Sequence, residues 1–237
     1  TQTTNGLIDV DQDLFIRSLA FDGSLGAIDV AAGRTLTFEA QTSSAVVTLG
    51  SASTLTGAGS IRLLGTQTLN FSSPFELTGT STRLDFSPSF ITVTGADLTI
   101  GSAGSLTLTA DTVNTVLAND GSLTIQNGTT NLNGAFSNSG LLAIEGTANS
   151  SATLNVDAFT NTVTIRFDNL YASAGRNQTF NVNGTLTNDG TIQTLQTGTG
   201  GSRTMSADVT QGAAGVIDID FNLTLSTLAL DLSLGTV

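Results

Sequence analysis

One short phrase returns along the chain, and it limits the fold more than any other feature. A small residue or Asn precedes a glycine turn, and a strand of alternating apolar residues follows, as around Gly104, Gly121 and Gly140. The steps between these glycines are 17 and 19 residues (104 to 121 and 121 to 140). A repeat this short cannot bury its own apolar face, so successive copies must stack into a continuous core. The phrase therefore predicts a β-solenoid with its function on a long regular surface.

Period-two alternation covers most of the chain. In Leu106-Thr107-Leu108, Leu123-Thr124-Ile125 and Phe180-Asn181-Val182, apolar residues alternate with Thr or Asn, so one face is buried and the other is wet. No segment combines helix-forming residues at helical spacing over three turns. We therefore expect an all-β fold, a parallel β-helix with little or no helix, of roughly 10–11 short coils at ~21 residues each. We assign residues 1–216 to this solenoid.

The C-terminal segment 217–237 differs from the repeats before it. Apolar residues alternate there without an intervening glycine, which indicates two long strands. Such a pair could add strands to the next subunit and join chains end to end, or it could fold back as a hairpin on its own chain. The candidate self-association residues are Ile217, Ile219, Phe221, Leu223, Leu225, Leu228, Leu230, Leu232 and Leu234.

Missing residue types exclude much of enzyme chemistry. The chain has no His, Cys, Trp or Lys, and its 7 cations are all Arg. Common zinc and haem ligand sets, disulfides, thiolate nucleophiles, imidazole bases and phosphate-binding lysines are therefore ruled out. A net charge of −12 repels a phosphate backbone, so we expect no nucleic-acid partner. No apolar run is long enough to cross a bilayer, so we expect no membrane insertion.

Asp9, Asp11 and Asp13 alternate along one segment, so a strand would place all three carboxylates on one side, where they could bind Ca²⁺. The segment is not an EF-hand, because no glycine follows Asp13 and Ala20 stands where the bidentate glutamate belongs. The alternative interpretation is a solvated acidic edge. We expect no other cofactor.

Polysaccharide-degrading enzymes are the catalytic alternative for a β-helix, and they would need paired acids or a calcium and arginine site on one face. Asp85 with Arg83, and Asp168 with Arg166, are acid and base pairs on one face of a strand, and we interpret them as surface ion pairs. The chain has one Tyr and no Trp, so it lacks the aromatic platforms that usually hold sugar rings. We therefore expect no enzyme activity. An acidic groove closed by the loops at 172–178 and 197–203 would favour the enzyme instead.

Thr-x-Thr phrases recur, for example at Thr35/Thr37, Thr92/Thr94 and Thr107/Thr109. Stacked in register on one flat face, they would resemble the threonine arrays of solenoid ice-binding proteins. Their separations are too uneven for a single array, so we interpret them as ordinary outward strand positions.

Three phrases carry a family resemblance: Asn-Asp-Gly-Ser-Leu-Thr-Ile at 119–125, Phe-Ser-Asn-Ser-Gly-Leu-Leu at 136–142 and Leu-Thr-Asn-Asp-Gly-Thr-Ile at 186–192. They resemble coils of bacterial haemagglutinin-type adhesins and autotransporter passenger repeats. The resemblance implies a right-handed parallel β-helix at the cell surface, and large exported repeat proteins of this class commonly lack Cys.

We therefore expect an extracellular, non-catalytic structural or adhesive solenoid, a building block of a surface fibre that associates with itself end to end. A host or matrix glycan surface is the other partner we consider. The alternatives are a surface-binding solenoid for ice or glycan, or a polysaccharide-degrading β-helix.

Overall fold

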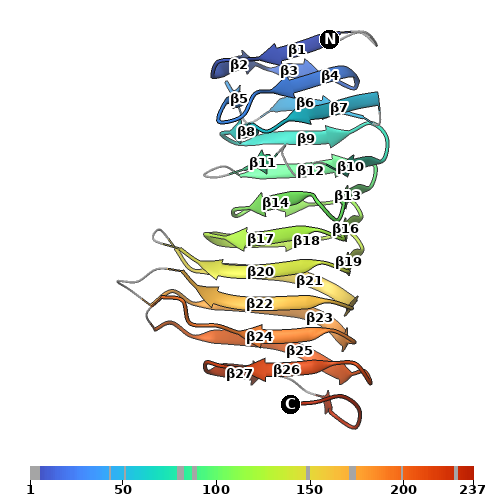
Figure 1. The fold of residues 1–237 in the computed structure, drawn as a ribbon, viewed down its shortest axis with the longest axis vertical. Coiled ribbons are helices and arrows are strands. Elements are labelled where there is room, and N and C mark those ends of the chain that lie inside the picture. Colours follow the sequence, from blue (N-terminus) through green and yellow to red (C-terminus); the bar gives the residue numbers. More distant parts are fainter. Residues whose placement is uncertain are drawn as a thin grey trace.

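The structure, a computed structural model, is a stack of parallel strands. It describes residues 6–42, 44–50, 52–78, 83–86, 90–147, 150–170, 175–198, 200–226 and 229–237, and these residues contain no helix. Figure 1 shows the coils descending from the N-terminus to the C-terminus. Each coil crosses three sides, which we call side 1, side 2 and side 3 in the order the chain meets them. The expected all-β solenoid is confirmed.

The strands divide among the three sides as follows. Side 1 holds β1 (Leu7–Val10), β4 (Leu25–Val30), β7 (Ala52–Gly57), β10 (Phe75–Leu77), β13 (Leu98–Ile100), β16 (Leu117–Asn119), β19 (Phe136–Asn138) and β28 (Leu230–Asp231). Side 2 holds β2 (Leu14–Ser18), β5 (Thr35–Ala40), β8 (Ser60–Leu64), β11 (Arg83–Asp85), β14 (Ser105–Leu108), β17 (Ser122–Gln126), β20 (Leu141–Gly146), β22 (Thr164–Asn169), β24 (Thr191–Thr194) and β26 (Val216–Ile219). Side 3 holds β3 (Ala20–Asp22), β6 (Ala45–Leu49), β9 (Gln67–Phe71), β12 (Ile91–Gly95), β15 (Thr112–Val113), β18 (Gly128–Leu132) and β27 (Leu223–Ser226). Three long strands run from side 3 onto side 1 without a break: β21 (Ala152–Asn161), β23 (Gln178–Asn188) and β25 (Arg203–Gln211).

The number of turns can be counted from the strands of side 2. Its strands form one 10-stranded parallel sheet, which gives about 9 turns, fewer than the expected 10–11 coils. Residues stacked one coil apart are 19 positions apart at Asn119 and Asn138, but 27 positions apart at Asn161 and Asn188. Extra residues at the corners lengthen some coils, so the chain makes fewer of them.

The core is a set of apolar columns that run the length of the stack. On side 2 each inward residue stacks on its counterpart in the next coil, because parallel pairing in register brings like residues together. This column contains Leu14, Leu36, Ile61, Leu84, Leu106, Leu123, Leu142, Ile165, Ile192 and Ile217. All but the first are at most 3% exposed, so the expected apolar interior is confirmed.

A column of buried amides lies at the corner between sides 1 and 2 in the C-terminal half. Each Asn donates from Nδ2 to the Oδ1 of the Asn one coil further on, at 2.6 Å from Asn119 to Asn138 and 2.7 Å from Asn138 to Asn161. The column continues through Asn188 to Gln211, whose Nε2 donates to the backbone oxygen of Thr236. We call these five residues the amide column. Buried amides are costly unless they are hydrogen-bonded, and the stacking provides a donor for every side-chain oxygen of the column except Oδ1 of Asn119.

The amide column explains the repeated phrase in which Asn comes two residues before Gly. Asn138 also donates from Nδ2 to the oxygen of Gly140, two residues along, at 3.2 Å, which closes the corner locally. A Cβ atom on Gly140 would lie 2.2 Å from the backbone oxygen of Gly121 in the coil before it. The glycine is therefore required because successive corners approach each other too closely for a side chain.

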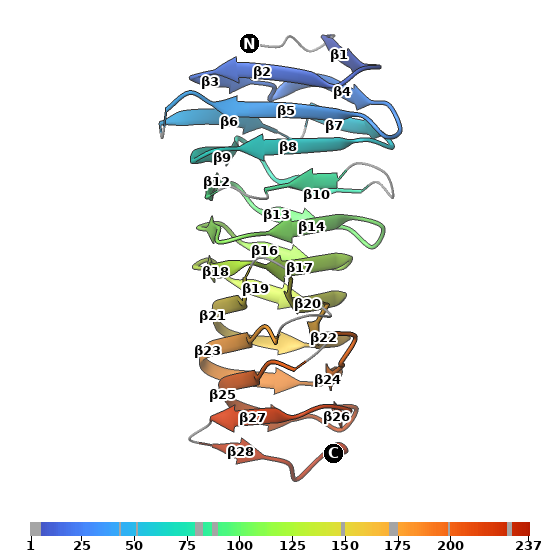
Figure 2. The same cartoon turned by 90° about the vertical axis from the view of Figure 1, so that its left-hand side faces the viewer.

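The segment 217–237 forms the last coil, with three short strands in place of the two long ones we expected. β26 pairs with β24, and β27 and β28 both pair with β25, all in parallel, so the segment is not a hairpin. The chain turns a corner at residues 220–222 between β26 and β27, which divides the apparently continuous alternation between two sides. Thr236 returns to bond Ile217 and the amide column. Figure 2 shows this coil closing the stack at its lower end.

Candidate functional site

The outward surface of side 3 carries the most regular polar pattern of the described residues. Five strands repeat the phrase Thr, apolar residue, then Asn or Ser, with the polar residues facing out, except that the middle residue is Thr130 in β18. Parallel pairing aligns the threonines in one row: Thr129, Thr153, Thr179, Thr204 and Thr224. A second row, two residues along each strand, contains Thr68, Thr92, Thr112, Asn131, Asn155, Asn181, Ser206 and Ser226. We call this second row the Asn row.

The Asn row is hydrogen-bonded along the axis of the solenoid. Asn155 donates from Nδ2 to Oδ1 of Asn131, and Asn181 donates to Asn155, both at 2.8 Å. Each Asn has two N–H donors and two acceptor lone pairs on its oxygen. Asn155 spends one donor and one lone pair on its neighbours in the row, so it retains one of each for another partner.

A groove runs beside the Asn row, where β21, β23 and β25 bend from side 3 to side 1. One part has a volume of about 360 Å³ and a second part about 180 Å³, and both are lined by Val182, Asn183 and Ser206. Asp157, Asn183 and Asp208 lie on the wall opposite the Asn row. Leu132, Val156, Val182 and Ala207 lie beneath the groove, and their side chains belong to the buried core.

A bulge shapes this bend. The pairing of β21 with β23 shifts between Asp157 and Phe159, and β23 has additional residues around Gly184. Gly184 has φ +114°, a backbone conformation that residues with a side chain rarely adopt. The bulge leaves Asn183 exposed at the wall, where it donates to Oδ1 of Asp157 at 3.0 Å.

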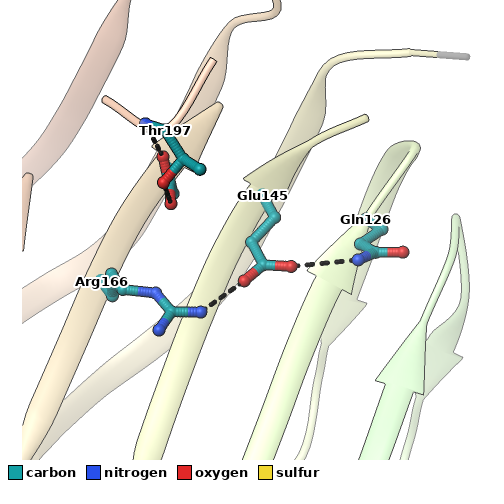
Figure 3. Close-up of polar contacts among 5 residues, drawn as sticks. Gln126, Glu145, Arg166 and Thr197 are labelled. Atoms are coloured by element: carbon teal, nitrogen blue, oxygen red, sulfur yellow. Dashed lines mark hydrogen bonds and ion pairs between the residues drawn. The ribbon is translucent and has the colours of Figure 1, made fainter. Parts of the chain in front are cut away.

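Side 2 carries the ion pairs. Arg166 donates to Oε1 of Glu145 at 2.5 Å, and Gln126 donates to Oε2 of the same carboxylate at 3.0 Å, as Figure 3 shows. Asp168, 3% exposed, accepts bonds from the backbone nitrogen and the hydroxyl of Thr197 at 3.0 and 2.6 Å. Both carboxylates are therefore held by neighbours, which suits structural roles better than proton transfer.

The expected pairing of Arg166 with Asp168 within one strand is not what the structure has. Arg166 contacts Glu145 in the preceding coil, and Asp85 is bonded by Arg62 of the preceding coil at 3.0 Å. Residues in register on neighbouring strands are closer than residues two apart on one strand, so the ion pairs join coils. The side chain of Arg83 lies outside the described residues.

Arg203 is a buried cation beneath the loop that follows β24. Its guanidinium donates to the backbone oxygen of Leu195 at 2.6 Å and lies 4.2 Å from the ring centre of Phe221. Burial lowers the pKa of Arg203. The side chain fastens the loop near 195–201 to the stack, so this turn-rich segment is a loop leaving the solenoid, as the sequence indicates.

The expected calcium ligands are not brought together. β1 ends at Val10, so Asp11 and Asp13 lie in the turn after it, and Oδ1 of Asp13 accepts the backbone N–H of Thr35 at 3.0 Å. Among the described residues no group of three or more acidic side chains could hold a metal ion. The three carboxylates do not share one face because the strand ends before Asp11, and the chain turns there.

The residues proposed for self-association fall into two groups. Ile217 is 3% exposed, and Leu223 and Leu225 pack against the core, so these three belong to the chain's own coil. Phe221 is half-buried under Arg203. Ile219, Leu230, Leu232 and Leu234 are 40–56% exposed at the lower end of the stack. Leu228 lies outside the described residues.

The two aligned polar rows are a feature that sequence reasoning missed. The Thr-x-Thr phrases divide among all three sides, for example β5 on side 2 and β12 on side 3, and so form no single array, as expected. The signal that could have found the aligned rows is the recurrence of Thr, a third residue and Asn or Ser at 129–131, 153–155, 179–181, 204–206 and 224–226.

No protein-family model, no curated protein and no solved structure matches the chain. Among the described residues no helix is long and apolar enough to cross a membrane.

Proposed function

We propose that the chain is a non-catalytic structural and adhesive module of an extracellular fibre of the haemagglutinin or autotransporter type, and that it stacks end to end with other copies. The observation that carries the proposal is that strand edges are unpaired at both ends of the stack. The described strands of the first coil (β1, β2 and β3) and two strands of the last coil (β27 and β28) each pair on one edge only, and the outer edge of β26 carries only the bridge to Thr236. Open parallel edges are templates for pairing with another chain.

Exposed apolar side chains accompany both open edges. Leu7, Phe15 and Leu19 are 58–60% exposed in the first coil. Leu234 and Val237 are 56% and 71% exposed at the other end. Stacking two such ends would bury apolar surface and pair backbone groups together, the two contributions that join coils within the chain.

Both ends are also acidic. Asp9, Asp11 and Asp13 are exposed in or beside the first coil, and Asp218 and Asp220 are exposed in the last. Like charges oppose association at low ionic strength and are screened by salt. We therefore expect assembly to strengthen as salt concentration rises.

The test is the mass of the chain in solution by light scattering over a range of concentration and salt, with electron microscopy of the same samples. We expect oligomers or rods longer than one stack, at least tenfold more abundant at high salt than at low salt. Phe15→Lys with Leu19→Lys should abolish them, while Val163→Lys, at a 45% exposed position in a coil away from both ends, should not. A chain that stays monomeric at every concentration and salt contradicts the proposal.

A further inference from the structure

The bulge in β23 contains a pair of residues that is chemically reactive. Asn183 precedes Gly184, and the glycine has no Cβ atom to hinder its backbone nitrogen from approaching the asparagine side chain. That nitrogen can attack Cγ of the asparagine and close a cyclic imide. The pair is therefore a place where the chain can be modified without an enzyme.

The reaction consumes water and releases ammonia. As the bond between the Gly184 nitrogen and Cγ of Asn183 forms, the bond from Cγ to Nδ2 breaks. Nδ2 leaves as ammonia and takes the proton that the backbone nitrogen gives up. Water then opens the imide at one of its two carbonyl carbons. One product has aspartate at position 183, and the other has isoaspartate, in which the backbone runs through the former side chain.

The pairing of the backbone decides how readily the ring forms in the folded chain. A residue held in register between two coils cannot turn its nitrogen towards the preceding side chain unless the coils part there. Within β23, all of which the structure describes, Gly184 alone has no register partner in either β21 or β25. Asn183, Gly184 and Thr185 are all exposed. The bulge therefore constrains this nitrogen less than a regular coil would.

The Asn-Gly pairs at 127–128 and 133–134 are held more tightly. In the first, the glycine N–H donates to the backbone oxygen of Ser151 at 2.7 Å. In the second, a Cβ atom on the glycine would lie 2.0 Å from the backbone oxygen of Thr115, so the neighbouring coil leaves the glycine little room to move. The pair at 5–6 begins outside the described residues. Among the pairs that the structure describes in full, the bulge therefore holds the least restrained one.

We propose that the bulge makes Asn183 a site of spontaneous deamidation, at which one residue of the groove wall changes from an amide to a carboxylate. Asn183 donates to Oδ1 of Asp157, which is in register one coil away. Both partners are exposed, so water competes for this bond and it restrains the asparagine only weakly. A carboxylate at position 183 cannot donate, so the bond is lost and two like charges face each other about 4.8 Å apart.

The experiment is storage of the purified full chain in mildly alkaline buffer, which deprotonates more of the backbone nitrogen, followed by peptide mass spectrometry over several weeks. The measured quantity is the rate at which each Asn-Gly pair gains the mass of an amide converted to an acid. We expect Asn183 to react more than about tenfold faster than Asn127 or Asn133, because neighbouring coils hold the glycines of those two pairs.

The same measurement in denaturant gives the rates without the fold. The three pairs should then react within about threefold of one another, because the coils no longer hold any of the glycines. The proposal is wrong if Asn183 reacts no faster than Asn127 or Asn133 in the folded chain. It is also wrong if the lead of Asn183 is as large in denaturant, because the bulge would then not be its cause.

Variants confirm which residue reacts. Asn183→Gln keeps an amide but needs a larger, less favourable ring, so deamidation at this position should stop. Asn183→Asp supplies one product, and the aged parent should contain an acidic form that migrates with it on isoelectric focusing. Asn133→Gln, the matched control at another exposed asparagine, should leave the rate at Asn183 unchanged. Equal acidification of the parent and of Asn183→Gln would contradict the proposal.

Discussion

The N-terminal and C-terminal halves of the rod turn the corner from side 1 to side 2 with different chemistry. In the upper coils most side 1 strands end on an apolar residue that packs into the core. These residues are Val10, Val30, Leu77 and Ile100. From Asn119 onward the same column is occupied by amides. One backbone path therefore accepts either a dry corner or a hydrogen-bonded one, provided that the column is consistent from coil to coil.

The boundary between the two halves has a visible cost. Ile100 stacks directly on Asn119, so Oδ1 of Asn119 is buried and has no hydrogen-bond partner. A buried polar atom without a partner costs about 1–3 kcal/mol. The comparison shows that amides inside the column are hydrogen-bonded on both sides, whereas the first amide, Asn119, has an oxygen without a partner.

The largest effect should come from breaking the column in its middle. Asn161→Leu removes the donor to Oδ1 of Asn188 and the acceptor of Asn138, so two buried groups lose a bond. We expect a loss of about 2–4 kcal/mol in the free energy of unfolding, measured by denaturant titration. Asn133→Ala, which breaks an exposed Asn pair with Asn114, should cost less than about 0.5 kcal/mol. Equal losses would contradict the role of burial.

Asp111, in the coil just above the boundary, should make stability depend on pH. It is fully buried, accepts the backbone N–H groups of Ile91 and Thr109, and has its pKa raised by burial from 3.8 to about 8. Because the folded pKa lies above the unfolded one, the folded state holds a proton that the unfolded state has lost between these values. Stability is therefore full below about pH 4, falls as pH rises towards 8, and then levels off, with a slope of at most about 1.4 kcal/mol per pH unit.

The pH effect has a clean control. Asp111→Asn keeps an acceptor oxygen and removes the titration, so its stability between pH 5 and 8 should be flat. Asp22 and Asp231 have lowered pKa values from hydrogen bonds, and their contribution is lost only when pH falls below the ordinary carboxyl range. Thermal melts of both proteins across this window make the comparison, and parallel slopes would exclude Asp111 as the cause.

The smallest effect should come from shortening the column at its beginning. Asn119→Leu removes the unpartnered Oδ1 but leaves Oδ1 of Asn138 without its donor, so the defect moves down by one coil. We expect a change under about 1 kcal/mol, well below that of Asn161→Leu. If Asn119→Leu proves as costly as Asn161→Leu, the boundary is not the weak point of the column.

The sequence was sufficient for the fold because period-two alternation and glycine corners are local. Asn188 shows what a local pattern does not reveal. In the sequence it looks like part of a turn, but in the structure its side chain is hydrogen-bonded to Asn161, which lies 27 residues earlier. The rows on side 3 were missed for the same reason, since coil length varies and only the structure fixes the register. Asp11 was placed on a shared face with Asp9 because alternation does not reveal where the chain turns a corner.

The amide column also has a direction. Every side chain from Asn119 to Asn188 donates towards the C-terminal end, so their dipoles align head to tail along the rod, as peptide dipoles do in a helix. The Asn row on side 3 runs the opposite way, because Asn155 and Asn181 donate towards the N-terminal end, so the two columns of side-chain dipoles oppose each other across the rod. A fibre that continued the parallel pairing of the coils from one subunit to the next would therefore owe its polarity to the direction of the strands, with all subunits pointing the same way, and not to a net dipole.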